Sequence, residues 1–283
     1  MKIRIAKSAG FCFGVKRATN LALDAAARTE HIHSLGPIIH SPQVVKKLQE
    51  KGVQVAHSVS EIECGAVIIR SHGITLDDQK EIARRHLEIV DATCPFVKKA
   101  QQHAELLSSK GYALVLVGEK EHPEVQGIFS YARGGDVFVV ADADEAEKLP
   151  CRKRVGVVAQ TTQAYDNFSR IVAVCLEKCE ELRVFKTICD ATAVRQNEAR
   201  DIASQSDVML VIGGFNSANT TRLATICREI IPCTHHIETA EEIDPQWFDG
   251  VESVGVTAGA STPHWVIEEV VERVQSIGKK GDN

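Results

Sequence analysis

The sequence lacks the common paired-cysteine signatures. None of its nine cysteines forms a CxxC pair, which excludes finger-type zinc sites and thioredoxin-type redox motifs. The odd count also argues against a full set of disulfides, which are rare in cytosolic proteins in any case. The cysteines are therefore expected to serve in metal binding, catalysis or packing.

Long apolar runs and basic stripes are also missing. The longest aliphatic runs, such as residues 208–212, are far too short to span a membrane. No apolar segment follows Lys2 and Arg4, so we expect no signal peptide and a cytoplasmic protein. A formal net charge of −5 without a basic stripe argues against nucleic acid as a partner. The expected partners therefore include neither a membrane nor a nucleic acid.

One stretch, residues 87–95, combines features of a ligand-binding site. Leu87, Ile89 and Val90 predict a short buried strand, and Pro95 suits the first position of a helix over residues 96–109. Cys94 would then lie between the carboxyl end of a strand and the amino end of a helix. In an open parallel sheet this crevice binds ligands, and the helix terminus favours a thiolate over a thiol.

The same arrangement occurs twice more. A predicted strand over residues 182–189 ends in Cys189 and precedes a helical run at 193–204. A strand at residues 2–6 reaches Cys12 through a short turn and precedes a helical run at 15–28. Three cysteines therefore occupy one repeated position in the predicted fold.

The whole order of elements is repeated at a spacing of roughly a hundred residues, which suits domains rather than a solenoid. Strands and helices alternate, so we predict three similar α/β domains with mainly parallel sheets. The first repeat is placed at residues 13–94, the second at 95–189 and the third at 190–277, before a tail at 278–283. The third repeat lacks a last strand, which we expect residues 1–12 to supply. Pseudo-threefold symmetry would direct all three cysteines into a central cavity.

Three cysteines at one repeated position favour a metal centre, although a lone cysteine is more often a small buried residue. A 4Fe-4S cluster normally takes four thiolates, so three would leave one iron open to a substrate oxygen. Zinc on three thiolates would instead leave a site for water and support hydrolysis. The pattern favours the cluster and leaves zinc open.

Hydrogen-bond donors follow several of the repeated strands and would line the same cavity. They are His40, His72, His122, Thr161 with Thr162, the segment 216–219, and Ser261. Donors near helix amino termini suit an anion such as phosphate or diphosphate. Glu124 lies just inside a helix start, where a carboxylate is commonly on the surface. If Glu124 faces the cavity, it is the natural general acid.

Several motifs together resemble one family. They are GFCFGV at 10–15, SHG at 71–73, DATCP at 91–95, EHPE at 121–124, QTT at 160–162, Cys189 with AT at 191–192 and RQ at 195–196, the segment 216–222, and GAS at 259–261. In this order they are similar to the 4-hydroxy-3-methylbut-2-enyl diphosphate reductases, the LytB family, whose members catalyse the last step of the methylerythritol phosphate route to isoprenoids. The match spans nearly the whole chain.

The resemblance implies one 4Fe-4S cluster per chain on Cys12, Cys94 and Cys189, with the substrate hydroxyl on the open iron. It implies that Glu124 and Thr161 deliver protons. It assigns substrate binding to His40, His72, His122, Thr161, Ser217, Asn219 and Ser261. At Ala218 the family usually has a second serine, so only the backbone N–H would remain for contact with the allylic diphosphate.

The implied reaction is a reductive dehydroxylation that gives isopentenyl and dimethylallyl diphosphates. Neither residues 118–122 nor residues 213–216 fit a dinucleotide fingerprint, so a ferredoxin or flavodoxin is the expected electron donor. A metallohydrolase acting on a phosphorylated substrate and a phosphometabolite-binding sensor are the alternatives. The remaining cysteines are interpreted as structural, with Cys175 and Cys179 sharing one helix face, and so is the pair His235 and His236.

Overall fold

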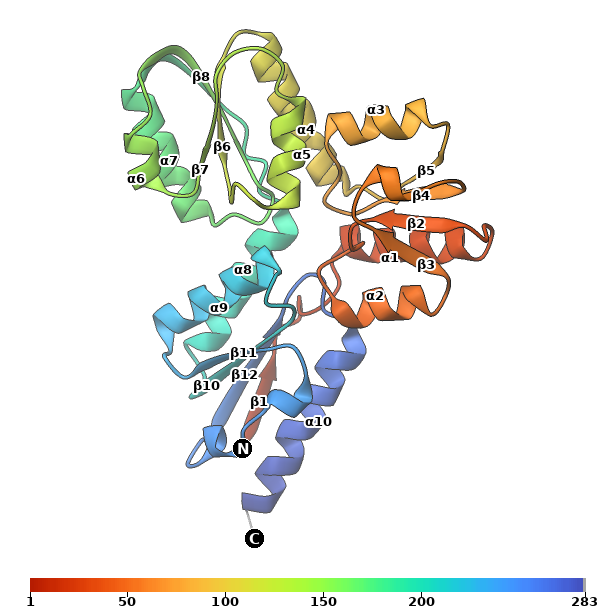
Figure 1. Cartoon of the computed structure of the whole chain (residues 1–283). Helices are drawn as coiled ribbons and strands as arrows, with labels where there is room; N and C mark the ends of the chain where they lie inside the picture. Colours follow the sequence, from red (N-terminus) through yellow and green to blue (C-terminus); the bar gives the residue numbers. More distant parts are fainter. Residues whose placement is uncertain (282–283) are drawn as a thin grey trace. The chain divides into compact units, whose positions relative to one another are not determined.

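The computed structural model describes residues 1–281, with side chains described through residue 279. The chain forms two compact units. The first unit comprises Met1–Val15, His40–Val44 and the described chain from Asp190 onward, and the second comprises Lys16–Ile39 and Val45–Cys189. Figure 1 shows the chain coloured along its sequence. The second unit contains two of the three sheets and the first unit contains the third.

The first sheet of the second unit has four parallel strands in the order β3-β2-β4-β5. These strands are β2 (Ile32–Leu35), β3 (Val53–Ala56), β4 (Ala66–Ile69) and β5 (Glu88–Asp91). The segments associated with them are α1 (Phe13–Ala26), α2 (Pro42–Gln49), η1 (Val59–Glu61) and α3 (Leu76–Arg84). All four residues of β4 are buried, as expected for an inner strand of a parallel sheet.

The second sheet repeats this topology in the order β7-β6-β8-β9. Its strands are β6 (Ala113–Val117), β7 (Val137–Val140), β8 (Arg152–Ala159) and β9 (Cys179–Val184). Its helices are α4 (Pro95–Ser109), α5 (Pro123–Tyr131), α6 (Ala143–Glu147) and α7 (Tyr165–Glu177). Along β6, Leu114 and Leu116 pack into one core while Val115 and Val117 pack into another, because successive side chains of a strand point to opposite faces.

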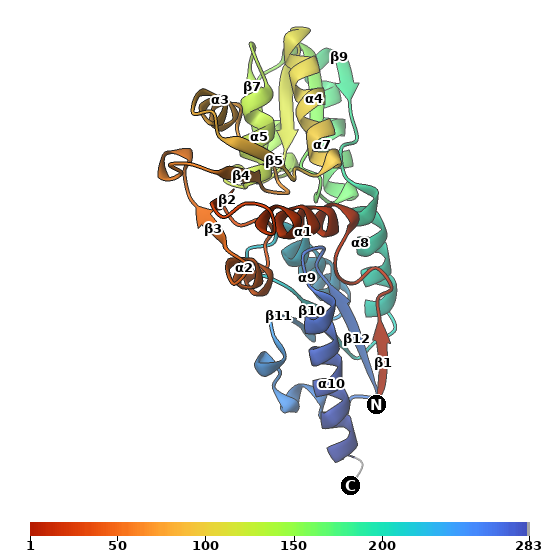
Figure 2. The same cartoon turned by 90° about the vertical axis from the view of Figure 1, so that its right-hand side faces the viewer.

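The first unit contains the third sheet, in the order β11-β10-β12-β1. Its strands are β10 (Val208–Ile212), β11 (Thr234–Ile237), β12 (Ser253–Ala258) and β1 (Lys2–Ile5). Its helical segments are α8 (Asp190–Ala203), α9 (Ala218–Ile230), η2 (Ala240–Glu242), η3 (Pro245–Phe248) and α10 (His264–Gly281). β1 pairs in parallel with β12, so the amino-terminal strand lies where the sequence predicts it, and Figure 2 shows the two strands side by side.

The predicted fold class, with similar α/β domains and parallel sheets, is confirmed. The predicted helix over residues 96–109, with Pro95 at its first position, matches α4 (Pro95–Ser109). The domain boundaries and the pseudo-threefold arrangement stay predictions. The helix α10 continues through Gly281 and so extends into the expected tail at 278–283. Residues 282–283 of that tail lie outside the described residues.

Two further details of the prediction were wrong. The strand expected to end at Cys189 is β9, which ends at Val184, five residues earlier. The helix α7 ends at Glu177, so Cys179 begins a strand and does not share a helix face with Cys175. The thiol of Cys179 instead donates to the Cys175 carbonyl oxygen at 3.1 Å.

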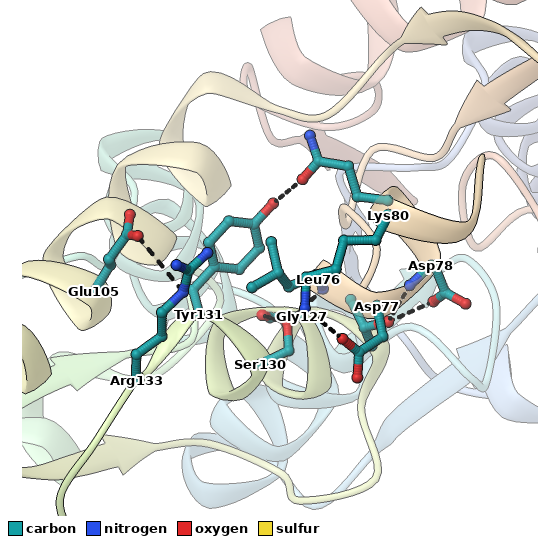
Figure 3. Close-up of polar contacts among 11 residues, drawn as sticks. Leu76, Asp77, Asp78, Lys80, Glu105, Gly127, Ser130, Tyr131 and Arg133 are labelled. Atoms are coloured by element: carbon teal, nitrogen blue, oxygen red, sulfur yellow. Dashed lines mark hydrogen bonds and ion pairs between the residues drawn. The ribbon is translucent and has the colours of Figure 1, made fainter. Parts of the chain in front are cut away.

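Polar contacts join the two repeats within the second unit. The Leu76 N–H at the start of α3 donates to the hydroxyl of Ser130 on α5 at 2.9 Å, as Figure 3 shows. The hydroxyl of Tyr131 donates to Oε1 of Gln79 at 2.8 Å. Arg133 forms an exposed ion pair with Glu105 of α4, and exposed pairs contribute little, about 0–1 kcal/mol. The part-buried hydrogen bond between Leu76 and Ser130 therefore contributes more to this junction than the exposed ion pair does.

Candidate functional site

The three cysteines predicted as metal ligands occupy one structural position in the three sheets. The Cys94 N–H donates to the Ser71 carbonyl at 2.9 Å, the Cys189 N–H to that of Thr161 at 3.0 Å, and the Cys12 N–H to that of Ala260 at 3.2 Å. Each accepting carbonyl lies two residues after the end of the third strand of its repeat, which is β4, β8 or β12. The repeated cysteine position inferred from the sequence is therefore a repeated hydrogen-bonded turn in the fold.

The chemistry of this donor set suits a thiolate-bound metal. All three cysteines are half-buried, and each lies just before a helix, where the partial positive charge favours the thiolate. Cys12 belongs to the first unit, whereas Cys94 and Cys189 belong to the second. Among residues 1–281, no group of three or more His, Cys, Asp or Glu side chains is positioned to hold a metal ion. The convergence of the three cysteines therefore stays a prediction.

Glu124 is the one candidate acid that the fold buries completely. Its side chain is 1% exposed, on the first turn of α5, where a carboxylate more often faces water. Oε1 accepts a hydrogen bond from the Thr161 N–H at 2.6 Å, and Oε2 accepts one from the Thr161 hydroxyl at 3.0 Å. Burial raises the pKa of Glu124 to about 7, against the lowering effect of these two hydrogen bonds. The carboxyl group is thus poised to hold and release a proton near neutral pH.

His122 caps the helix that carries Glu124. Its Nδ1 accepts a hydrogen bond from the Glu124 N–H at 3.1 Å. A ring nitrogen that accepts cannot carry a proton, so the proton of a neutral imidazole lies on Nε2, which can donate to an anion. The ring of His72 meets that of His122 edge to face, with centroids 5.6 Å apart. Within the second unit, the structure thus brings together Glu124, Thr161, His122 and His72.

The first unit brings together the other predicted anion-binding residues. Ser217 caps α9, accepting from the Thr220 N–H at 3.4 Å, and Ala218 opens the helix, where backbone N–H groups have no partner within the helix. The Ser261 hydroxyl donates to the His40 carbonyl at 2.9 Å. Asn219 is 5% exposed, and neither atom of its side-chain amide has a hydrogen-bond partner in the part of the chain that the structure describes. A buried amide without partners is costly, which points to a ligand that completes it.

Sequence analysis missed three residues that hold the cysteine turns. Arg17 donates to backbone carbonyls just before Cys94, and Arg195 and Glu198 bind the backbone just before Cys12. Arg195 entered the sequence analysis only as part of a family motif, while Arg17 and Glu198 did not enter it. No spacing rule identifies such contacts, because the partners are up to 191 residues apart.

The cysteines and histidines that were interpreted as structural lie outside the three cysteine turns. Cys175 and Cys227 are buried in apolar cores, and burial raises the pKa of Cys175 to about 11 and that of Cys227 to about 12. His235 stacks on Trp247 with ring centroids 3.7 Å apart, and Nε2 of His236 is hydrogen-bonded to the Gly213 carbonyl. Cys64, Cys151 and Cys233 are exposed, outside the repeated turns.

Three parallel sheets with their helices, equivalent cysteine turns and a buried acid with a raised pKa are typical of an α/β enzyme. The sequence matches the family model described as "LytB protein" over residues 3–275, so the chain belongs to the LytB family. It is 66% identical over 279 residues to the 4-hydroxy-3-methylbut-2-enyl diphosphate reductase of Syntrophotalea carbinolica, covering 99% of this chain and 100% of that protein. It is 59% identical over 281 residues to the reductase of the same name from Pelobacter propionicus, with 99% and 100% covered.

Two solved structures are also similar. One is the structure of an (E)-4-hydroxy-3-methyl-but-2-enyl diphosphate reductase, the terminal enzyme of the non-mevalonate pathway. It is 46% identical, with a TM-score of 0.70, and the match covers 97% of this chain and 99% of that one. The other is the E-1-hydroxy-2-methyl-but-2-enyl-4-diphosphate reductase from Plasmodium falciparum, 26% identical with a TM-score of 0.89, covering 97% and 87%. Separately, none of the helices in the described chain combines the length and apolar character needed for a membrane span.

Proposed function

We propose that this protein reduces (E)-4-hydroxy-3-methylbut-2-enyl diphosphate to isopentenyl diphosphate and dimethylallyl diphosphate, the last step of the methylerythritol phosphate pathway. The observation that carries the proposal is the buried Glu124 carboxyl, with a pKa of about 7, bound by Thr161, whose carbonyl in turn accepts from the Cys189 N–H. Membership of the LytB family and 66% identity to a reductase of that name support it.

The proposed cofactor is one 4Fe-4S cluster per chain on Cys12, Cys94 and Cys189, with one iron open. When bound, such a cluster supplies a Lewis acid for the allylic hydroxyl and a route for electrons. The equivalent turns and half-burial of the three cysteines suit this role. Cys175 and Cys227 are unsuited to it, because burial keeps each as a neutral thiol.

The diphosphate is proposed to bind a set of hydrogen-bond donors, which are Ser217, the Ala218 N–H, Asn219, Ser261, His40, His72 and His122. The orphaned amide of Asn219 and the start of α9 suit phosphate oxygens, because helix amino termini bind anions. The inferred Nε2–H of His122 gives a further donor. Thr161 is proposed to contact the substrate near its reacting end.

Glu124 is proposed as the general acid. Removal of the hydroxyl as water consumes two protons and two electrons per substrate, so the oxygen leaves with a hydrogen in its place on the carbon skeleton. Glu124 gives a proton to the departing oxygen, and Thr161 fixes the carboxyl in position through two hydrogen bonds. Protonation of the allylic fragment at either end would give the two products.

The electrons are proposed to come from a ferredoxin or flavodoxin in the cytoplasm. Neither glycine-containing loop, 118–122 or 213–216, fits a dinucleotide fingerprint, so a nicotinamide or flavin bound in the Rossmann manner is not expected. An external one-electron carrier therefore suits the chain better than a bound dinucleotide.

The test is anaerobic purification followed by metal analysis and assay with reduced methyl viologen as the electron donor. We expect brown protein, about four irons per chain and release of both isomeric diphosphates from the substrate. Colourless protein with one zinc that hydrolyses a phosphate ester would overturn the proposal in favour of a metallohydrolase. Tight binding of the substrate without turnover would indicate a sensor.

A further inference from the structure

Arg195 is a buried cation that binds the loop before Cys12. It lies on α8, the helix that begins directly after Cys189, and its side chain is 3% exposed. Nη2 donates to the carbonyls of Ser8 at 2.6 Å and Gly10 at 2.8 Å, and Nη1 donates to the carbonyl of Ala191 at 3.2 Å. Burying a guanidinium is costly unless it is hydrogen-bonded, so the bonds from Nη1 and Nη2 hold the loop and the side chain together.

Glu198 lies one turn further along α8 and binds N–H groups of the same loop, whereas Arg195 binds its carbonyls. Its carboxylate accepts from the N–H groups of Lys7 at 2.7 Å and Ser8 at 2.8 Å, and from the Ser8 hydroxyl at 2.5 Å. Gly10 has a φ of +95°, and a Cβ there would meet the Thr262 carbonyl at 3.3 Å. The segment before Cys12 is therefore held between α8 and the loop after β12.

Arg17 binds the turn before Cys94 in the same way. It lies on α1, the helix that begins after Cys12, and donates to the carbonyls of Thr93 at 3.1 Å and Asp91 at 3.2 Å. The Thr93 N–H donates to Oδ1 of Asp91 at 2.9 Å, which closes the turn from within. The two carbonyls precede Cys94 by one and three residues, as those held by Arg195 precede Cys12 by two and four.

These contacts follow one rule around the three cysteines. The helix after Cys12 holds the turn before Cys94, and the helix after Cys189 holds the loop before Cys12. The helix after Cys94, α4, completes the series through His103, whose ring stacks on Phe185 at 3.9 Å, four residues before Cys189. The segment before each of the three cysteines is thus contacted by a helix that begins after a different one of them.

We propose that Arg17 and Arg195 are positioning residues for the metal centre, which fix the backbone of Cys94 and Cys12 from helices that begin after other ligands. This inference rests on the proposed function, because it takes the three cysteines as cluster ligands. A cysteine on an unrestrained loop would lose conformational entropy each time it bound the metal, whereas a fixed turn has already lost it. Partners that orient metal ligands typically change metal affinity about 10- to 100-fold when removed.

The variants are Arg17→Gln and Arg195→Gln, with Arg195→Lys as the conservative change and Arg85→Gln as the matched control. Arg85 also anchors a loop from a helix end, donating to the carbonyls of Val59 at 2.9 Å and Ile62 at 2.8 Å, but no cysteine ligand follows that loop. Each anaerobically loaded protein is measured for the rate of iron loss to a chelator, the electron paramagnetic resonance spectrum of the reduced cluster, and Tm.

We expect both glutamine variants to lose iron about 10- to 100-fold faster than wild type and to give altered cluster spectra. Arg195→Lys should recover part of the loss, because one ammonium can still donate to both carbonyls. Arg85→Gln should lower Tm while leaving iron loss and spectrum at wild-type values.

If Arg17→Gln and Arg195→Gln match the Arg85→Gln control in iron loss and spectrum, the positioning role is overturned, while the proposed function stands. Wild-type protein that binds no iron under anaerobic conditions would instead overturn the proposed function, and the positioning role with it. Hydrogen exchange of the amides at residues 7–12 and 91–94 checks that the faster iron loss comes from loosening of these two segments. Both segments should exchange faster in the corresponding glutamine variant than in the control.

Discussion

The N–H of Thr161 donates to Glu124 at 2.6 Å while the carbonyl of the same threonine accepts from the N–H of Cys189 at 3.0 Å. One residue therefore connects the buried acid to the turn that carries a proposed metal ligand. A shift of the Cys189 turn would move the donor that steadies the carboxylate. The proposed proton donor and the proposed metal ligand are thus linked by hydrogen bonds through Thr161.

Replacement of Glu124 by glutamine should lower kcat by about 10²- to 10⁴-fold, the usual effect of removing a general acid. The glutamine side chain keeps the volume and can still accept a hydrogen bond from Thr161, so iron content and the cluster spectrum should stay at wild-type values. The assay is turnover with reduced methyl viologen at equal iron loading. Wild-type kcat in this variant would remove Glu124 from proton delivery.

Thr161→Val removes the hydroxyl that donates to Glu124 Oε2 but keeps the N–H that donates to Oε1. Because the hydroxyl stabilises the carboxylate, its loss should raise the pKa of Glu124 above about 7. The alkaline limb of the kcat profile should move to higher pH, and Thr161→Ser should return it to the wild-type position. An unmoved limb in Thr161→Val would show that another group sets it.

Stability should depend on pH through Glu124. Its pKa is raised from 4.5 to about 7 by burial, so the native state binds more protons than the unfolded state between these values. The resulting stabilisation is fully present below pH 4.5 and is lost as the pH rises through about 7. Relative to Glu124→Gln, wild-type Tm should therefore fall between pH 5 and pH 8, as calorimetry of the metal-free proteins would measure. A constant difference across this range would contradict the raised pKa.

Asn219→Leu should separate stability from binding. The amide of Asn219 is buried without partners, and such a group costs about 1–3 kcal/mol, which leucine of similar shape would relieve. We expect an unchanged or higher free energy of unfolding together with KM raised about 10- to 100-fold, because the amide can no longer bind the diphosphate. Denaturant unfolding and steady-state kinetics measure the two effects. Loss of stability with unchanged KM would assign the amide a structural role.

Cys94→Ser should lose the cluster and activity together, whereas Cys175→Ala should keep both. Cys175 is 1% exposed in an apolar core, so its replacement removes packing but no proposed ligand. Iron content per chain, the visible spectrum and turnover distinguish the two variants. A Cys94→Ser protein that retains iron and turnover would show that the ligand assignment is wrong.

The sequence predicts the regular elements well where pattern and packing agree. Residues 66–69 are all aliphatic and form an inner strand buried on both faces, and Pro95 begins its helix as expected. β9 was placed wrongly because its residues, Cys179–Val184, include three charged side chains and are all at least partly exposed, as an edge strand allows. Residues 185–189, whose apolar members Phe185 and Ile188 suggested a strand, follow it as a loop, where the Thr187 hydroxyl donates to the carbonyl of Ala159.

The candidate site was predictable only as a set of residue types. The pairing of Glu124 with Thr161 spans 37 residues, and the raised pKa comes from burial, which no local pattern encodes. No local pattern encodes the burial of the Asn219 amide without hydrogen-bond partners either. Arginine contacts to backbone carbonyls carry no sequence signature either, because every residue offers the same acceptor.

The parallel pairing of β1 with β12 has a consequence for synthesis on the ribosome. Residues 2–5 emerge first, but their partners at 253–256 emerge almost last. The strand that leads to Cys12 must therefore wait, unpaired, until nearly the whole chain has been translated. The second unit can fold during this interval, whereas insertion of the proposed cluster at Cys12 would have to follow chain completion. Nascent chains truncated before β12 should therefore be unable to mature.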